Sequence, residues 1–153
     1  RKIVYNKVKE LGMRVLGLDL GTKTLGMAIS DETMFIASGL ETFHFKVRNF
    51  DAAYRRIDEV IAKYDVKEIV IGLPYYNSGD LSPTAKMVLK FKEILETRID
   101  IPVYTQNESY SSFEAESYML EGFVSRKKRK EVIDKMAAVV ILQSYLDHRG
   151  GKK

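Results

Sequence analysis

The stretch that decides the fold is VLGLDLGTKTLGMAISD, which runs from Val15 to Asp31. Two apolar runs, 14–20 and 25–30, flank the short segment 21–24, and this spacing is typical of a β-hairpin. One carboxylate, Asp19, stands late in the first apolar run. An ionised carboxylate in a buried strand costs free energy unless it is paired or bound to a cation. The hairpin therefore predicts a functional site as well as a pair of strands.

The residues around Asp19 are small. Side chains alternate along a strand, so Gly17 shares a face with Asp19, and Gly26, Ala28 and Ser30 share a face of the second strand. If these two faces are aligned, they leave an open pocket beside the carboxylate. The alternative is an aspartate that only organises the turn that follows it.

The rest of the chain predicts an α/β fold. A third strand is expected at 35–45, and further strands at 68–72 and 102–105. Helical spacing of apolar residues is found at 53–64, 85–95, 113–120 and 132–146. Three strands followed by alternating helices and strands predict a mixed five-stranded sheet with helices on both faces. We expect one domain at 13–147, with a short extension at 1–12 and a tail at 148–153.

The composition limits the possible sites. The chain of 153 residues has no cysteine, which excludes disulfides and thiolate zinc sites, and its two histidines, His44 and His148, are far apart in sequence. Any metal is therefore expected to bind to oxygen. No apolar run reaches the roughly 18 residues of a membrane-spanning helix, and no signal peptide is recognisable. We expect a soluble, cytoplasmic protein that does not bind membranes.

Positive charge is concentrated in one place. The net charge of +4 is modest, but five consecutive cations precede the last predicted helix: Arg126, Lys127, Lys128, Arg129 and Lys130. Such a run is a candidate docking site for a nucleic acid, and the alternative is a solvated, charged linker. Lys23, in the turn after Asp19, is a further candidate for contact with a nucleic-acid backbone.

Two more carboxylates are candidates for the same site as Asp19. Glu108 follows Asn107 at the end of a predicted strand, where open α/β sheets place their ligands; a solvated or helix-capping role is the alternative. Asp134 begins the last apolar helix, where an interaction with the helix dipole is the alternative. Three converging carboxylates suit Mg²⁺ or Mn²⁺. Two such ions, about 4 Å apart, promote hydrolysis of phosphodiesters.

Several segments together resemble a known family. They are DLGTKTLG at 19–26, GLP at 72–74, and the basic run with the IDKMAA segment at 133–138. They look like the YqgF family, also called RuvX, the Holliday-junction-resolvase-like or pre-16S rRNA processing nucleases. The resemblance covers about 13–147. It implies a ribonuclease-H-like fold, a metal-dependent acidic site, and a role in maturation of the 5′ end of 16S rRNA or, by analogy with RuvC, in junction cleavage.

The resemblance assigns the site residue by residue. The family's first-strand aspartate falls on Asp19, its final-helix aspartate on Asp134, and the glutamate of its Asp-Glu-Arg motif on Glu108. This chain departs from that motif, because Asn107 replaces the aspartate and Ser109 the arginine. Asn107 still offers a neutral oxygen behind the metal ligands, but one negative charge and one phosphate-binding cation are missing.

We therefore expect a nuclease that uses two Mg²⁺ or Mn²⁺ ions and acts on structured nucleic acid, either pre-16S rRNA or branched DNA. The ribosome or its precursor is an expected partner. One alternative is a protein that binds RNA or the ribosome and has lost catalysis. Another is an ATP-binding relative of the actin-like sugar kinases, whose phosphate loop resembles DLGTK, although those proteins need two lobes and this chain has room for one.

Overall fold

The structure is a computed structural model that describes residues 13–74, 82–107 and 126–151; the side-chain surroundings of 126–134 and 150–151 are not part of the description. The elements, in chain order, are β1 (Arg14–Leu20), β2 (Thr24–Ser30), β3 (Ala37–His44), α2 (Phe50–Tyr64), β4 (Val66–Leu73), α3 (Pro83–Arg98), β5 (Val103–Asn107) and α5 (Arg126–Gly151).

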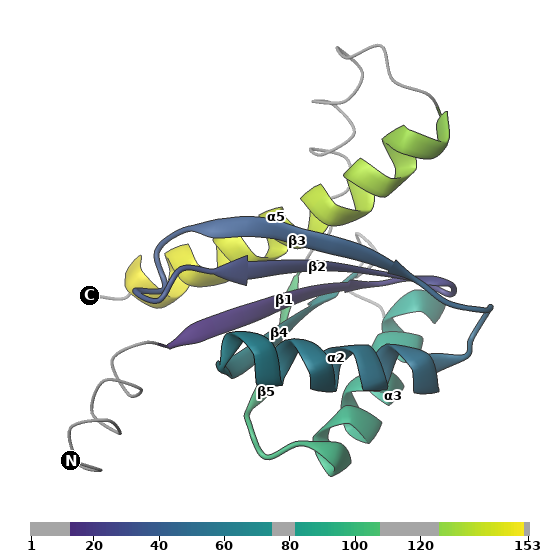
Figure 1. The fold of residues 1–153 in the computed structure, drawn as a ribbon, viewed down its shortest axis with the longest axis horizontal. Helices are drawn as coiled ribbons and strands as arrows, with labels where there is room; N and C mark the ends of the chain where they lie inside the picture. Colours follow the sequence, from purple (N-terminus) through teal and green to yellow (C-terminus); the bar gives the residue numbers. More distant parts are fainter. Residues whose placement is uncertain (1–12, 75–81, 108–125, 152–153) are drawn as a thin grey trace.

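The five strands form one mixed sheet in the order β3-β2-β1-β4-β5. β2 is antiparallel to both β1 and β3, whereas β4 is parallel to β1 and β5 is parallel to β4. Helices α2 and α3 cover one face of the sheet and α5 lies across the other (Figure 1). The predicted fold class, including the initial antiparallel strands, is confirmed.

The last helix is longer than the sequence pattern predicts. α5 begins at Arg126, so the five consecutive cations belong to a helix and the linker alternative is wrong. Lysine and arginine are good helix formers, but a prediction that starts from apolar spacing does not detect them. α5 also continues to Gly151, into the expected C-terminal tail. The helix predicted at 113–120 lies outside the described residues. None of the described helices is long and apolar enough to cross a membrane.

The two faces of the sheet contribute to different cores. Leu16 and Leu18 of β1 belong to the larger core, which packs against α2 and α3. The α2 positions that face it include Ala53, Ile57 and Val60, as the helical spacing predicts. The α5 face holds a smaller core, which consists of Val15, Ala28, Val70, Ala138, Ile141, Leu142 and Leu146.

Helix α5 packs directly on the backbone of β1 at Gly17. A Cβ atom on Gly17 would lie 2.7 Å from the Cβ of Leu142 and 3.2 Å from the backbone oxygen of Ala138. Gly17 is in register with Ala28 on β2, and Ala28 is in register with Gly39 on β3. This row of small residues across three strands makes the close approach of α5 possible.

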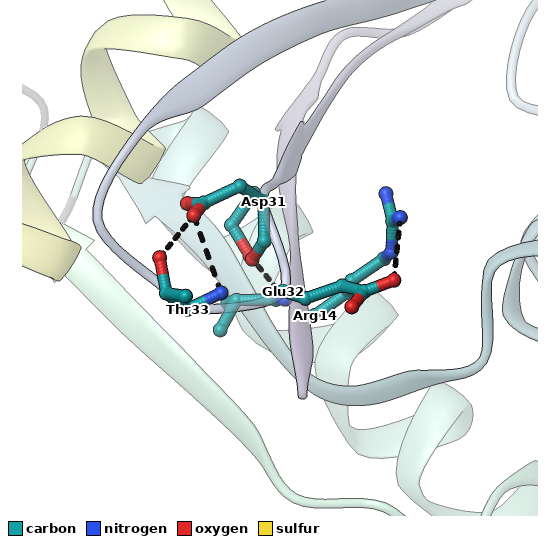
Figure 2. Close-up of polar contacts among 6 residues, drawn as sticks. Arg14, Asp31, Glu32 and Thr33 are labelled. Atoms are coloured by element: carbon teal, nitrogen blue, oxygen red, sulfur yellow. Dashed lines mark hydrogen bonds and ion pairs between the residues drawn. The ribbon is translucent and has the colours of Figure 1, made fainter. Parts of the chain in front are cut away.

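The turn between β2 and β3 is organised by Asp31. Its carboxylate accepts hydrogen bonds from the backbone N–H groups of Phe35 (2.9 Å), Ile36 (2.8 Å) and Thr33 (3.2 Å), and from the hydroxyl of Thr33 (Figure 2). These donors, the Ile36 N–H first, hold the pKa of Asp31 far below its usual range. The role of Asp31 is therefore structural: its carboxylate holds the turn between β2 and β3.

Replacing Gly17 with alanine should lower the free energy of unfolding by about 1–3 kcal/mol, because the added methyl group meets a helix that cannot retreat locally. Denaturant unfolding measures this loss. Gly21→Ala is the matched control, since its new Cβ would closely approach one atom, the Thr24 hydroxyl oxygen at 3.0 Å in the same turn, with the next atom at 3.6 Å. Equal losses for the two variants would contradict the close packing at Gly17.

Asp31→Asn should lower stability at neutral pH, and the deficit should shrink under acid. The pKa of Asp31 is depressed in the folded state, so its carboxylate contributes stability above the ordinary aspartate pKa of about 3.9, and this contribution is lost as the pH falls through the folded value. Urea unfolding at pH 7 and pH 3 measures the difference between wild type and variant. A deficit that grows on acidification would refute this assignment. Glu32→Gln, in an exposed ion pair with Arg14, is the control.

Candidate active site

Asp19 lies at the C-terminal end of β1, half-buried and on the face that α5 covers. Its register partner on β2 is Gly26, and the partner of Gly26 on β3 is Thr42. The small-residue face of β2 is therefore the face aligned with Asp19, and the β2 residue directly opposite the carboxylate has no side chain. Thr42 was not identified from the sequence, because its place in this row depends on the pairing of β2 with β3.

The turn that follows Asp19 is fixed by backbone hydrogen bonds. The N–H of Gly21 donates to the carbonyl of Thr24 at 2.8 Å, and the carbonyl of Lys23 accepts a hydrogen bond of 3.0 Å from the N–H of Phe45. The side chain of Lys23 is exposed at the edge of the sheet where Asp19 lies. The structure therefore brings these two predicted residues to one edge.

Helix α5 runs antiparallel to β1. Ala138, in the middle of the helix, lies against Gly17. Near the other end of the helix, the Nε of Arg149 forms an ion pair of 3.2 Å with Glu68, which is in register with Val15. A step along β1 from Val15 toward its C-terminal end therefore corresponds to a step along α5 toward the N-terminal end of the helix.

Asp134 occupies the position one helical turn before Ala138, and Asp19 lies two residues after Gly17. One helical turn advances about 5.4 Å and two strand residues advance about 6.7 Å, so the two steps are of similar length. The backbone of α5 thus leads from Gly17 toward the edge where Asp19 lies, and it also crosses the sheet toward β3, where Lys135 lies against Gly39. The side chain of Asp134 is outside the described set.

The third candidate position follows β5. Strands β1, β4 and β5 are parallel, so their C-terminal ends meet at one edge of the sheet. The amide of Gln106 donates to the hydroxyl of Ser144 in α5 at 3.1 Å, which places Gln106 on the α5 face. Strand alternation assigns the exposed Asn107 to the opposite face from Asp19. Glu108 lies outside the described residues.

Among the residues with described side chains, no group of three or more histidine or carboxylate residues is close enough to hold a metal ion. Two of the three predicted ligands, Glu108 and Asp134, are outside that set. Of the three, Asp19 is the one whose side chain is described, and its carboxylate is the type of oxygen donor that a hard divalent cation prefers. The basic residues 126–130 form the first turns of α5, at the same end of the helix as Asp134.

Comparison with known proteins identifies relatives along almost the whole chain. Residues 13–148 match the RuvX family, described as Holliday junction resolvase. A protein of Geobacillus sp. (strain WCH70), named "Putative pre-16S rRNA nuclease", is 48% identical over 137 residues, which cover 90% of this chain and 99% of that protein. A protein of the same name from Bacillus cereus (strain AH187) is 46% identical over 137 residues, with 90% and 100% covered.

Solved structures share the fold. RuvC of T. thermophilus in complex with a Holliday junction substrate has a TM-score of 0.60 at 19% identity, covering 91% of this chain and 97% of that chain. The Fowlpox virus resolvase, in complex with Holliday junction DNA, has a TM-score of 0.51 at 13% identity, covering 90% and 99%. These likenesses confirm the expected ribonuclease-H-like fold. The family match and the two close relatives confirm the resemblance drawn from the motifs, and the chain belongs to the RuvX family of nucleases.

Proposed function

We propose that this protein is a divalent-metal-dependent nuclease that hydrolyses a phosphodiester bond near the 5′ end of pre-16S rRNA. The observation that carries the proposal is the half-buried Asp19 at the C-terminal edge of β1, opposite a glycine and on the face along which α5 advances. The names of the relatives support pre-16S rRNA as the substrate. Recruitment to the ribosome or its precursor is consistent with such a substrate.

In this proposal, Asp19, Glu108 and Asp134 hold Mg²⁺ or Mn²⁺. Asp19 fits this role because it offers an anionic oxygen that is partly shielded from water, next to a position without a side chain. Glu108 has this part because it matches the glutamate of the family's motif, directly after the end of β5 in the sequence. When bound, two such ions activate a water molecule and stabilise the leaving oxygen. The supporting part expected for Asn107 is not included, because strand alternation assigns Asn107 to the face opposite Asp19.

In this proposal, the basic run at 126–130 binds the phosphate backbone of the substrate. The N-terminus of a helix carries a partial positive charge, so cations in the first turn are unfavourable for the helix. The first turn of α5 has no acidic residue and begins with Arg126, Lys127 and Lys128; Arg129 and Lys130 follow directly. Helix stability does not explain this arrangement, whereas a phosphate backbone gains from both the cations and the dipole. Lys23 adds a cation from the turn beside Asp19.

A four-way DNA junction is the second candidate substrate, because the matching family is described as Holliday junction resolvase. A third reading, a binding protein without catalysis, draws on the departures at Asn107 and Ser109. The three candidates differ in what they cleave and in whether they cleave at all, so cleavage assays separate them.

Asp19→Asn should lower cleavage of the substrate at least about 100-fold while binding is retained, because loss of a direct metal ligand costs more than loss of a supporting one. The assay compares a labelled pre-16S 5′ leader with a four-way DNA junction, each with Mg²⁺ and with Mn²⁺. Asp65→Asn is the matched control, since Asp65 is a surface residue with φ 55°, a backbone region that asparagine tolerates. Absence of cleavage by the wild type, with binding intact, would support the non-catalytic alternative.

Mg²⁺ or Mn²⁺ should stabilise the wild type and not Asp19→Asn. A ligand that binds only the folded state at 100 times its Kd adds about 2.7 kcal/mol, which for a domain of this size raises Tm by roughly 5–10 °C. Thermal unfolding with increasing metal concentration measures this shift, and Asp65→Asn should respond like the wild type. An equal rise in Tm for Asp19→Asn would place the metal elsewhere.

A further inference from the structure

A groove of about 310 Å³ lies between the loop after β3, the first turns of α2 and the first half of α3. We call it the α2–α3 groove. Its lining includes three aromatic residues, one methionine and three cations: Phe50, Tyr54, Phe91, Met87, Arg48, Lys86 and Lys90. It lies on the face of the sheet opposite α5 and has no part in the proposed metal site. Its volume is at the lower end of the range of small-ligand sites and suits a ligand of about one nucleotide.

The wall of the groove is aromatic and held in place by ring packing. Phe50 and Met87 are half-buried, so part of each side chain remains accessible. The ring of Phe50 packs edge-on against Phe91, with 5.6 Å between the ring centroids, and Phe91 stacks on Tyr54 at 4.7 Å. An accessible ring held in this way offers a surface on which a nucleobase can stack, whatever the sequence.

The rim of the groove is positively charged. Arg48, Lys86 and Lys90 line it and are exposed, and no lining residue is acidic. Lys90 is paired with Glu93 at 3.3 Å. Within the part of the chain that the structure describes, neither Arg48 nor Lys86 forms an ion pair. These two cations therefore offer positive charge that no described carboxylate neutralises.

Arg48 adopts an unusual backbone conformation. Its φ of 59° lies in the left-handed region, where glycine and asparagine are favoured and other residues are strained. Its N–H donates a hydrogen bond of 2.7 Å to the carbonyl of Thr22, three residues after Asp19. Glycine would adopt this backbone conformation without strain. The fold therefore gives no reason for an arginine side chain at this position. The same hydrogen bond ties the groove to the turn beside the candidate active site.

We propose that the α2–α3 groove binds one unpaired nucleotide of the nucleic-acid substrate. The base packs against Phe50 and Met87, and the adjoining phosphate contacts Arg48 and Lys86. This proposal rests on the proposed nuclease function. An aromatic wall beside a cationic rim is the combination with which proteins hold single-stranded nucleic acid. The groove would therefore favour substrates that have an unpaired segment next to the cleaved bond.

The test measures binding of a labelled single-stranded RNA and of the same strand with abasic residues, by fluorescence anisotropy in EDTA so that no cleavage occurs. Arg48→Gly should weaken binding of both strands on the order of tenfold and flatten the slope of log K against log salt by about 0.7. Its Tm should not fall. Phe50→Leu should weaken binding of the intact strand roughly tenfold and leave the abasic strand unchanged. Arg55→Ala removes an exposed cation of α2 outside the groove and should bind both strands like the wild type.

The outcomes separate this proposal from the proposed function. If the wild type cleaves its substrate but Arg48→Gly and Phe50→Leu bind like Arg55→Ala, the groove proposal is overturned and the nuclease stands. If Phe50→Leu weakens both strands equally, the base contact is overturned. If the wild type neither binds nor cleaves nucleic acid, the proposed function and the groove proposal fall together. Should Phe50→Leu fail to fold, Arg48→Gly with its unchanged Tm carries the test alone.

Discussion

The contact of α5 with the bare backbone of β1 at Gly17 is the constraint on which the rest of the structure depends. A helix normally meets a sheet through two layers of side chains, but along this row Gly17 and Gly39 have no side chain and Ala28 has only a methyl group. At Gly17 the position of α5 is therefore set by the Cβ of Leu142 and the backbone oxygen of Ala138, which are atoms that cannot rotate away. Because Asp19 is two residues along β1 and Asp134 one turn along α5, this packing also sets the relation of the two candidate ligand positions.

Polar contacts at the C-terminal half of α5 prevent the helix from sliding along that row. The side chain of Gln143 accepts a hydrogen bond of 2.9 Å from the N–H of Ala37 and donates one of 2.8 Å to the carbonyl of Phe35. The buried Glu68 pairs with Arg149, and burial raises the pKa of the neighbouring Tyr145 to about 12, so that its hydroxyl stays protonated. The anchored half fixes the direction of the N-terminal half, which carries Asp134 and the basic run.

Strand alternation and helical spacing were sufficient to predict the sheet, because each face of each strand has a consistent chemical character. They were not sufficient to assign a role to single residues. The alternative considered for Asp19, an aspartate that only organises a turn, describes Asp31, whose partners are backbone N–H groups that no pattern of side chains identifies. Thr42 and Arg48 depend on strand pairing and backbone torsion, which the sequence does not specify locally. The linker alternative for the basic run failed because charge alone does not distinguish a helix from a loop.

The departure of this chain from the family's Asp-Glu-Arg motif has a consistent electrostatic interpretation. Asparagine at 107 removes one negative charge and serine at 109 removes one positive charge, so the net charge of the motif is the same. Asn107 lies at the end of β5, and alternation assigns it to the face opposite Asp19, where a carboxylate would contribute to the metal only from a distance. The missing arginine is a loss of phosphate binding rather than of metal binding. Cations elsewhere, in the first turns of α5 and at the rim of the α2–α3 groove, are the ones that we propose to bind the nucleic acid. Under that proposal, the loss of the arginine at 109 changes where the backbone is held more than whether it is held.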